Sequence, residues 1–157
     1  MLKQIMVMLA LCVPGAALAA DWQYEGGAIP IAYVDNGAAQ LHFACRGGDL
    51  ALGYWVRAPH REVAGAAAIS VALTPDPPTG STIYAQDMPL IHADGSSVIV
   101  RGPVAQQWAR LAQRARTGLR VAYARPDAKG SLGFLDTHDF GASGSAAAIK
   151  RVLEICG

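Results

Sequence analysis

Apolar and polar residues alternate along three successive segments in the first third of the chain. This period of two predicts strands that are buried on one face. The segments are 29–34, 40–45 and 50–56. Asn36-Gly37 separates the first two and favours a tight hairpin, because both turn residues need positive φ. Gly47-Gly48-Asp49 separates the second and third, so we expect a three-stranded antiparallel meander.

The same alternation returns in shorter segments later in the chain. They are 69–73, 83–84, 89–92, 98–100, 119–123 and 132–140. Asp94-Gly95 predicts a second hairpin, between 89–92 and 98–100. The proline-rich segment 74–80 is expected to form a surface loop, because proline cannot donate a ladder hydrogen bond. Segment 59–65 is expected to form a charged loop.

Two segments repeat apolar residues at the spacing of a helix instead. In the first, about 103–116, Pro103 stands in the first turn, where its missing N–H removes no hydrogen bond. The second, about 145–155, follows serines, and we expect Ser143 or Ser145 to cap it. The predicted fold class is therefore α+β, a mostly antiparallel β sandwich or curved sheet with two helices.

The N-terminal segment has the layout of an export signal. Lys3 gives a positive start, and 5–13 is an apolar run too short for a stable membrane anchor. Ala17-Leu18-Ala19 is a small-x-small cleavage pattern. We interpret 1–19 as a cleaved signal peptide and 20–157 as a single exported domain, periplasmic or secreted, that is not an integral membrane protein.

Composition narrows the class of partner. The chain has 13 Lys and Arg residues against 12 Asp and Glu residues, and loss of Lys3 with the signal balances these charges. Neither this balance nor export favours a nucleic-acid partner. Motifs for ATP, dinucleotides, metalloprotease zinc and zinc ribbons are absent from the sequence, so we expect no cofactor and no metal.

Two cysteines, Cys45 and Cys156, remain once Cys12 leaves with the signal. In an oxidising compartment an isolated pair typically forms a disulfide. Cys45 shares a strand face with Leu41 and Phe43, and Cys156 shares a helix face with apolar residues, so both thiols are expected to point toward the core. We predict a Cys45–Cys156 bridge, with a reactive thiol as the alternative.

Asp136, His138 and Ser143 form a pattern that points to catalysis. On a strand, Asp136 and His138 share a face, where a carboxylate orients an imidazole in Ser-His-Asp hydrolases. Ser143 lies between a strand and a helix, although segment 141–145 lacks the final glycine of the nucleophile motif. A solvated strand end and a helix cap also explain these residues. We predict no catalytic residue and keep a small Ser/His hydrolase as an alternative.

Arginines gather between Asp94 and Asp127, a segment without acidic residues. They are Arg101, Arg110, Arg114, Arg116, Arg120 and Arg125. Arg110 and Arg114 share a helix face away from Trp108. This arrangement is typical of a solvated face, and the alternative is a contact for an anionic partner, such as an acidic protein surface, lipid headgroups or cell-wall material. We take Arg110 and Arg114 as candidate binding residues.

Two sequence patterns that occur together in this chain resemble those of a known class of proteins. The patterns are Leu41-His42-Phe43-Ala44-Cys45, with a hairpin on either side, and Phe140-Gly141-Ala142-Ser143-Gly144-Ser145-Ala146-Ala147-Ala148-Ile149 followed by Cys156. They resemble small bacterial envelope proteins of the invasion-associated locus B and type VI secretion VasI kinds. This resemblance implies a noncatalytic periplasmic β-rich domain, and it carries over no active site.

A second resemblance covers less of the chain. The run from Phe43 to Leu52 is similar to the start of bacterial inhibitors of C-type lysozyme, and Gly80 to Tyr84 is similar to their Ser-Gly-x-x-Tyr loop. The leading hypothesis is thus a noncatalytic periplasmic or secreted interaction module of the bacterial envelope. A lysozyme inhibitor and a small hydrolase are the alternatives.

Mass spectrometry of the mature protein tests the export signal. Cleavage after Ala19 predicts an N-terminus at Ala20, because small residues at Ala17 and Ala19 suit the signal peptidase. A lipoprotein signal would instead leave a modified Cys12 at the N-terminus, but Leu11 stands where that signal has a small residue. A mature chain that begins at Cys12 would contradict the prediction.

Overall fold

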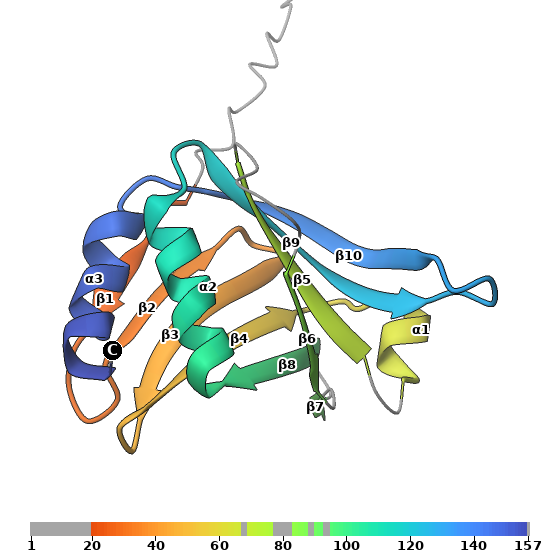
Figure 1. Ribbon diagram of the computed structural model, residues 1–157, viewed down its shortest axis with the longest axis horizontal. Helices are drawn as coiled ribbons and strands as arrows, with labels where there is room; N and C mark the ends of the chain where they lie inside the picture. The colour runs from red at the N-terminus through yellow and green to blue at the C-terminus, as the bar shows by residue number, and fades with distance from the viewer. Residues whose placement is uncertain (1–19, 67–68, 77–82, 88–89, 93–94, 157) are drawn as a thin grey trace, which may run out of the picture.

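The described residues form two antiparallel sheets, one of six strands and one of four (Figure 1). The computed structural model describes residues 20–66, 69–76, 83–87, 90–92 and 95–156. The predicted signal peptide lies outside the described residues. The predicted α+β class with mostly antiparallel strands is confirmed.

The larger sheet has the strand order β1-β2-β3-β4-β8-β7. Its strands are β1 (Gln23–Glu25), β2 (Ile31–Asp35), β3 (Ala39–Arg46), β4 (Asp49–Val56), β7 (Leu90–His92) and β8 (Gly95–Arg101). β2, β3 and β4 form the predicted meander, in which Leu41 pairs with Val34 on one side and Tyr54 on the other. All three are buried. β7 and β8 form the second predicted hairpin, with Asp94 of its turn outside the described residues.

The smaller sheet has the order β10-β9-β5-β6. Its strands are β5 (Ile69–Asp76), β6 (Ile83–Asp87), β9 (Gly118–Pro126) and β10 (Leu132–Gly141). The prediction of a loop is wrong for residues 74–76, because β5 continues through them. Pro75 pairs with Leu119 of β9, and the described pairing of β5 with β6 extends to Leu73. Residues 77–80 lie outside the described residues.

A bulge interrupts β10. Leu135 pairs with Tyr123 and His138 pairs with Val121, so β10 contains one extra residue between these two pairs. Within this interval Asp136 has a φ of 47°. A bulge of this kind bends the strand and redirects its side chains.

Three carbonyl groups of β10 accept hydrogen bonds from side chains of the N-terminal half. The donor and acceptor pairs are Tyr54 with Asp136, Asn36 with Asp139, and Trp22 with Gly141. These bonds occupy backbone acceptors that an edge strand would otherwise offer to another chain. They also join the outermost strand of the smaller sheet to the larger sheet.

Three helices occur among the described residues: α1 (Arg61–Ala64), α2 (Gly102–Arg114) and α3 (Ser145–Cys156). α2 and α3 are the predicted helices, and α1 is a single turn in the segment expected to be a loop. The prediction that Ser145 caps α3 is wrong, because its hydroxyl is buried without a partner. Gly144, with a φ of 78°, turns the chain into the helix. No helix in the described part of the chain is long and apolar enough to cross a membrane.

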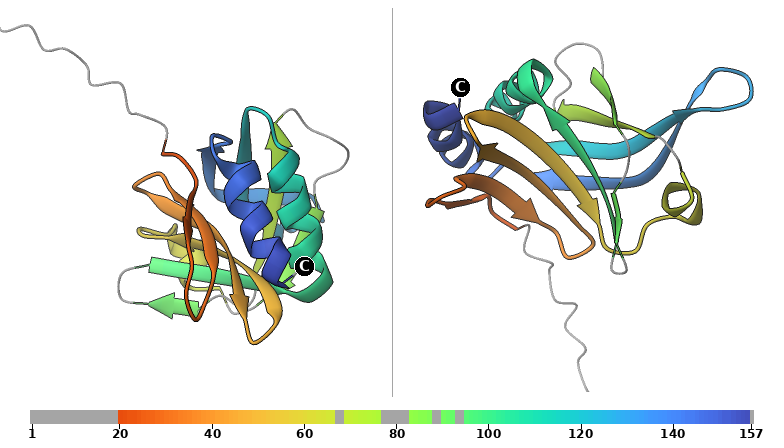
Figure 2. Two further views of the ribbon diagram at one scale, coloured as in Figure 1. Left: turned by 90° about the vertical axis from the view of Figure 1, so that its left-hand side faces the viewer. Right: turned by 90° about the horizontal axis from the view of Figure 1, so that it is seen from below.

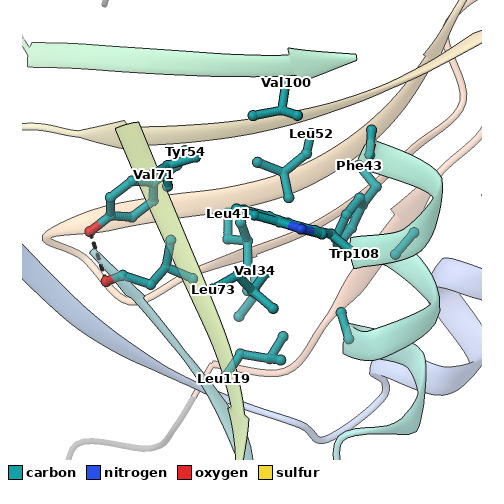
Figure 3. Close-up of a cluster of buried hydrophobic side chains, with 14 of the residues drawn as sticks. Val34, Leu41, Phe43, Leu52, Tyr54, Val71, Leu73, Val100, Trp108 and Leu119 are labelled. Carbon is teal, nitrogen blue, oxygen red and sulfur yellow. Dashed lines mark hydrogen bonds between the residues drawn. The ribbon is translucent and has the colours of Figure 1, made fainter. Parts of the chain in front are cut away.

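α2 and α3 lie side by side against the strands of the larger sheet (Figure 2). Trp108 of α2 is fully buried and lies beside Leu41 and Phe43 of β3 (Figure 3). Burial of the indole ring removes apolar surface from water, which stabilises the packing of α2 on the sheet. Because Trp108 fixes which face of α2 meets the core, the opposite face is left to the solvent.

The predicted disulfide is present. Cys45 of β3 and Cys156 at the end of α3 are bonded, with their Cα atoms 5.7 Å apart and 111 positions apart in the sequence. Both residues are buried. The bridge therefore holds the last helix against an early strand, although the two are far apart in the sequence.

Removal of the bridge tests its contribution to stability. Replacing both Cys45 and Cys156 by alanine should lower the free energy of unfolding by about 2–5 kcal/mol, because the unfolded chain is no longer closed into a long loop. Urea unfolding of the oxidised protein and of the variant measures this difference. Reductant should weaken the wild type and leave the variant unchanged. Equal unfolding midpoints for the two proteins would contradict the prediction.

Candidate functional site

Arg110 and Arg114 lie exposed on α2, on the side opposite to buried Trp108. Together with their neighbours they line a surface groove of about 420 Å³. The other lining residues are Pro103, Gln106, Gln107 and Leu111. The structure therefore places the two predicted binding residues side by side, next to amide groups that donate and accept hydrogen bonds.

Other arginines of the same run have acidic partners. Arg120 of β9 makes a two-point ion pair with Asp139 of β10, at 2.8 and 3.2 Å. This hydrogen bonding raises the pKa of Arg120. Arg125 forms an ion pair with Glu62 of α1. Within the described residues the two α2 arginines have no ion pair, so they differ from Arg120 and Arg125.

Asp136, His138 and Ser143 do not form the hydrogen bonds that a hydrolase requires. The bulge breaks the alternation on which the pairing of Asp136 with His138 depends. The Asp136 carboxylate instead accepts a hydrogen bond from the backbone amide of His60, at 2.8 Å. The His138 ring lies beside Tyr54, with ring centroids 6.3 Å apart. Among the described residues, no hydrogen bond joins this imidazole to Asp136 or Ser143.

His42 of β3 lies on the outer face of the larger sheet, away from the core residues with which it alternates. Its cross-strand neighbours are Tyr33 and Gly53. A Cβ at Gly53 would lie 2.3 Å from the imidazole, so the ring rests directly on the glycine. Burial lowers the pKa of His42 to about 4, with a smaller effect from the charge of Arg46. The described residues contain no cluster of three or more His, Cys, Asp or Glu side chains that could hold a metal.

The smaller sheet carries two adjoining hollows on its outer face, and the sequence patterns do not predict them. One has a volume of about 500 Å³ and lies by the paired glycines Gly118 and Gly141. The other has a volume of about 360 Å³ and lies over Ala72 and Ala122. The residues that line both are Thr74 and Arg120.

Phe134 and Thr137 of β10 form one wall of the hollow over Ala72 and Ala122, which we call the alanine hollow. Two strand residues three positions apart normally point to opposite faces. The extra residue in the bulge brings these two to the same face, so the bulge builds the wall. The sequence signal for this surface is limited to small residues, such as Ala72 and Ala122, at positions that alternate with core residues.

No protein-family model, curated protein or solved structure matches this chain. The resemblances to envelope proteins and to lysozyme inhibitors therefore remain predictions from sequence patterns.

The pKa of His42 predicts a pH dependence of stability. The folded-state pKa of about 4 lies below the ordinary value of 6.5, so the unfolded chain binds more protons between these pH values. Stability must then fall as the pH decreases through this window. Urea unfolding of the wild type and of His42→Gln at about pH 7 and about pH 4.5 isolates this effect, because other titrating groups are common to both proteins. The wild type should lose more stability than the variant, and an equal loss would show that His42 does not contribute.

Proposed function

We propose that this protein is a noncatalytic binding module of the bacterial envelope, periplasmic or secreted, that binds an anionic partner on α2. The proposal depends on one observation. Arg110 and Arg114 line a groove without ion pairs among the described residues, while Arg120 and Arg125 of the same run are paired with acidic side chains.

The chemistry of the groove favours an anion. A guanidinium group presents planar N–H donors that match the oxygens of a carboxylate or phosphate. Arg110 and Arg114 stand one helical turn apart, so both donors reach one extended anionic group. No acidic residue occurs between Asp94 and Asp127, so the sequence places no acidic neighbour close to them along the chain. Gln106 and Gln107 add neutral hydrogen-bonding groups at the same groove.

The disulfide supports an exported location. Bridges of this kind persist in oxidising compartments and are rare in the reducing cytosol. Cys45 and Cys156 are both buried in the fold, as a structural bridge requires. The apolar N-terminal segment with its cleavage pattern supports the same location.

The arrangement of Asp136, His138 and Ser143 supports a function without catalysis. A serine hydrolase needs an imidazole within hydrogen-bonding reach of its nucleophile and held by a carboxylate. Here the carboxylate bonds a backbone amide, and the described structure lacks the hydrogen bonds between the three side chains. Inhibition of C-type lysozyme remains an alternative that a direct assay of the purified protein decides.

Charge reversal tests the binding proposal. Arg110→Glu with Arg114→Glu should reduce binding to polyglutamate or to anionic phosphatidylglycerol vesicles by at least about tenfold, because two attractive contacts become repulsive. Binding is measured by co-sedimentation with vesicles and by titration with the polymer. Added salt should weaken binding by the wild type, since exposed charges are screened.

The matched control is Arg46→Glu with Lys129→Glu. Both residues are exposed, Arg46 in β3 and Lys129 between β9 and β10, and the double change alters the net charge by the same amount. This control should bind much more tightly than the α2 variant. If both variants lose the same amount of binding, net charge alone explains the loss and the proposed site on α2 is wrong. Unchanged binding by the α2 variant would also contradict the proposal. Circular dichroism verifies that each variant is folded.

A further inference from the structure

We propose that the outer face of the smaller sheet packs against the same face of a second copy of this chain. This self-association is separate from the arginine groove on α2. It rests on the alanine hollow, on the exposed apolar side chains beside it and on the charges that border it.

The alanine hollow is a recess bordered by described residues of β5, β9 and β10. Ala72 and Ala122 form its floor, and they are direct cross-strand partners in the centre of the sheet. Neither side chain is large enough to fill the space above its strand. On the β10 side, the larger side chains of Phe134 and Thr137 form a wall of the recess. The volume of about 360 Å³ is sufficient to receive a large side chain from a partner.

An exposed aromatic side chain stands next to this recess. Phe134 is 51% exposed, and Leu132 on the same strand is 43% exposed. Large apolar side chains with this exposure lose contact with water when a partner covers them. A projecting aromatic group and an apolar recess thus lie side by side on one face.

A protrusion next to a recess is self-complementary. When two copies are related by a twofold axis, each contact between residue i and residue j occurs twice. Two such faces therefore insert Phe134 of each copy into the alanine hollow of the other. Phe134 then acts as an aromatic anchor of the kind that protein interfaces commonly contain.

The charges on this face favour a second copy over a strongly charged partner. Asp76 and Asp139 line the larger hollow and Arg120 lines both, and Arg120 already forms an ion pair with Asp139. Two nearly neutral faces approach each other without strong repulsion. The face of α2 that carries Arg110 and Arg114 would repel its own copy, so it is a poor surface for self-association.

The size of the face predicts a weak dimer. The described part of this face consists of β5, β9 and β10, with 8, 9 and 10 residues. At about 4.8 Å between strands and about 3.3 Å per residue, these strands cover roughly 430 Å² on each copy. The total of about 860 Å² lies in the range of weak, transient complexes. We therefore expect a weak, reversible dimer.

Sedimentation of the purified, disulfide-bonded protein from about 5 to about 500 μM tests the proposal. The wild type should pass from monomer to dimer across this range. Phe134→Glu should raise the dissociation constant at least about tenfold, because it places a charge in an apolar contact. The matched control is Ile155→Glu, which changes an apolar side chain of α3 that is 55% exposed. This control should dimerise like the wild type.

Two results would overturn the proposal. If the wild type stays monomeric at every concentration, this face does not bind a second copy. A dimer that Phe134→Glu and Ile155→Glu weaken equally would place the interface elsewhere. Thr137→Arg, at an exposed wall position, provides a second variant that should also weaken the dimer. Phe134→Glu and Ile155→Glu carry the same net charge and should bind anionic vesicles equally, which separates this proposal from that for α2.

Discussion

The Cys45–Cys156 bridge is the constraint on which the arrangement of the helices depends. It fixes the end of α3 to β3, and α3 then covers apolar residues of the larger sheet. α2 packs beside α3 and inserts Trp108 into the core, so its opposite face must be exposed. The position of Arg110 and Arg114 at the surface is thus a consequence of the bridge, of helix packing and of one buried tryptophan.

Tyr54 joins the larger sheet to the smaller one, as the disulfide joins α3 to β3. Its ring is buried against Tyr123, with centroids 5.0 Å apart, and its hydroxyl donates a hydrogen bond to the carbonyl of Asp136 in the β10 bulge. Burial raises the pKa of Tyr54, so the hydroxyl keeps its proton and remains a donor. The bulge in turn places Phe134 and Thr137 on one face. A contact inside the core therefore shapes a recess on the outer surface.

Local patterns predict the parts of this fold that depend on local chemistry. Alternation around Leu41 and the Asn36-Gly37 turn predict the meander, and the apolar spacing around Trp108 predicts α2. The cysteine pair and the export signal together predict the disulfide. In contrast, the β10 bulge depends on Tyr54 and His60, which are distant in sequence, and no local pattern contains that information.

The candidate sites divide in the same way. Helical spacing alone places Arg110 and Arg114 on one exposed face, but the ion pair that sets Arg120 apart requires the pairing of β9 with β10. The alanine hollow requires three strands in register. Strand alternation wrongly aligns Asp136 with His138 because an inserted residue shifts the register. Surfaces built on one helix are thus more predictable than surfaces built across a sheet.

Non-reducing peptide mapping of the protein isolated from its native cells tests the central claim most directly, that this is an exported domain held together by one bridge. The predicted result is a single linked pair of peptides that contain Cys45 and Cys156, with neither thiol available to an alkylating reagent. Two freely alkylated thiols in the folded native protein would contradict the claim.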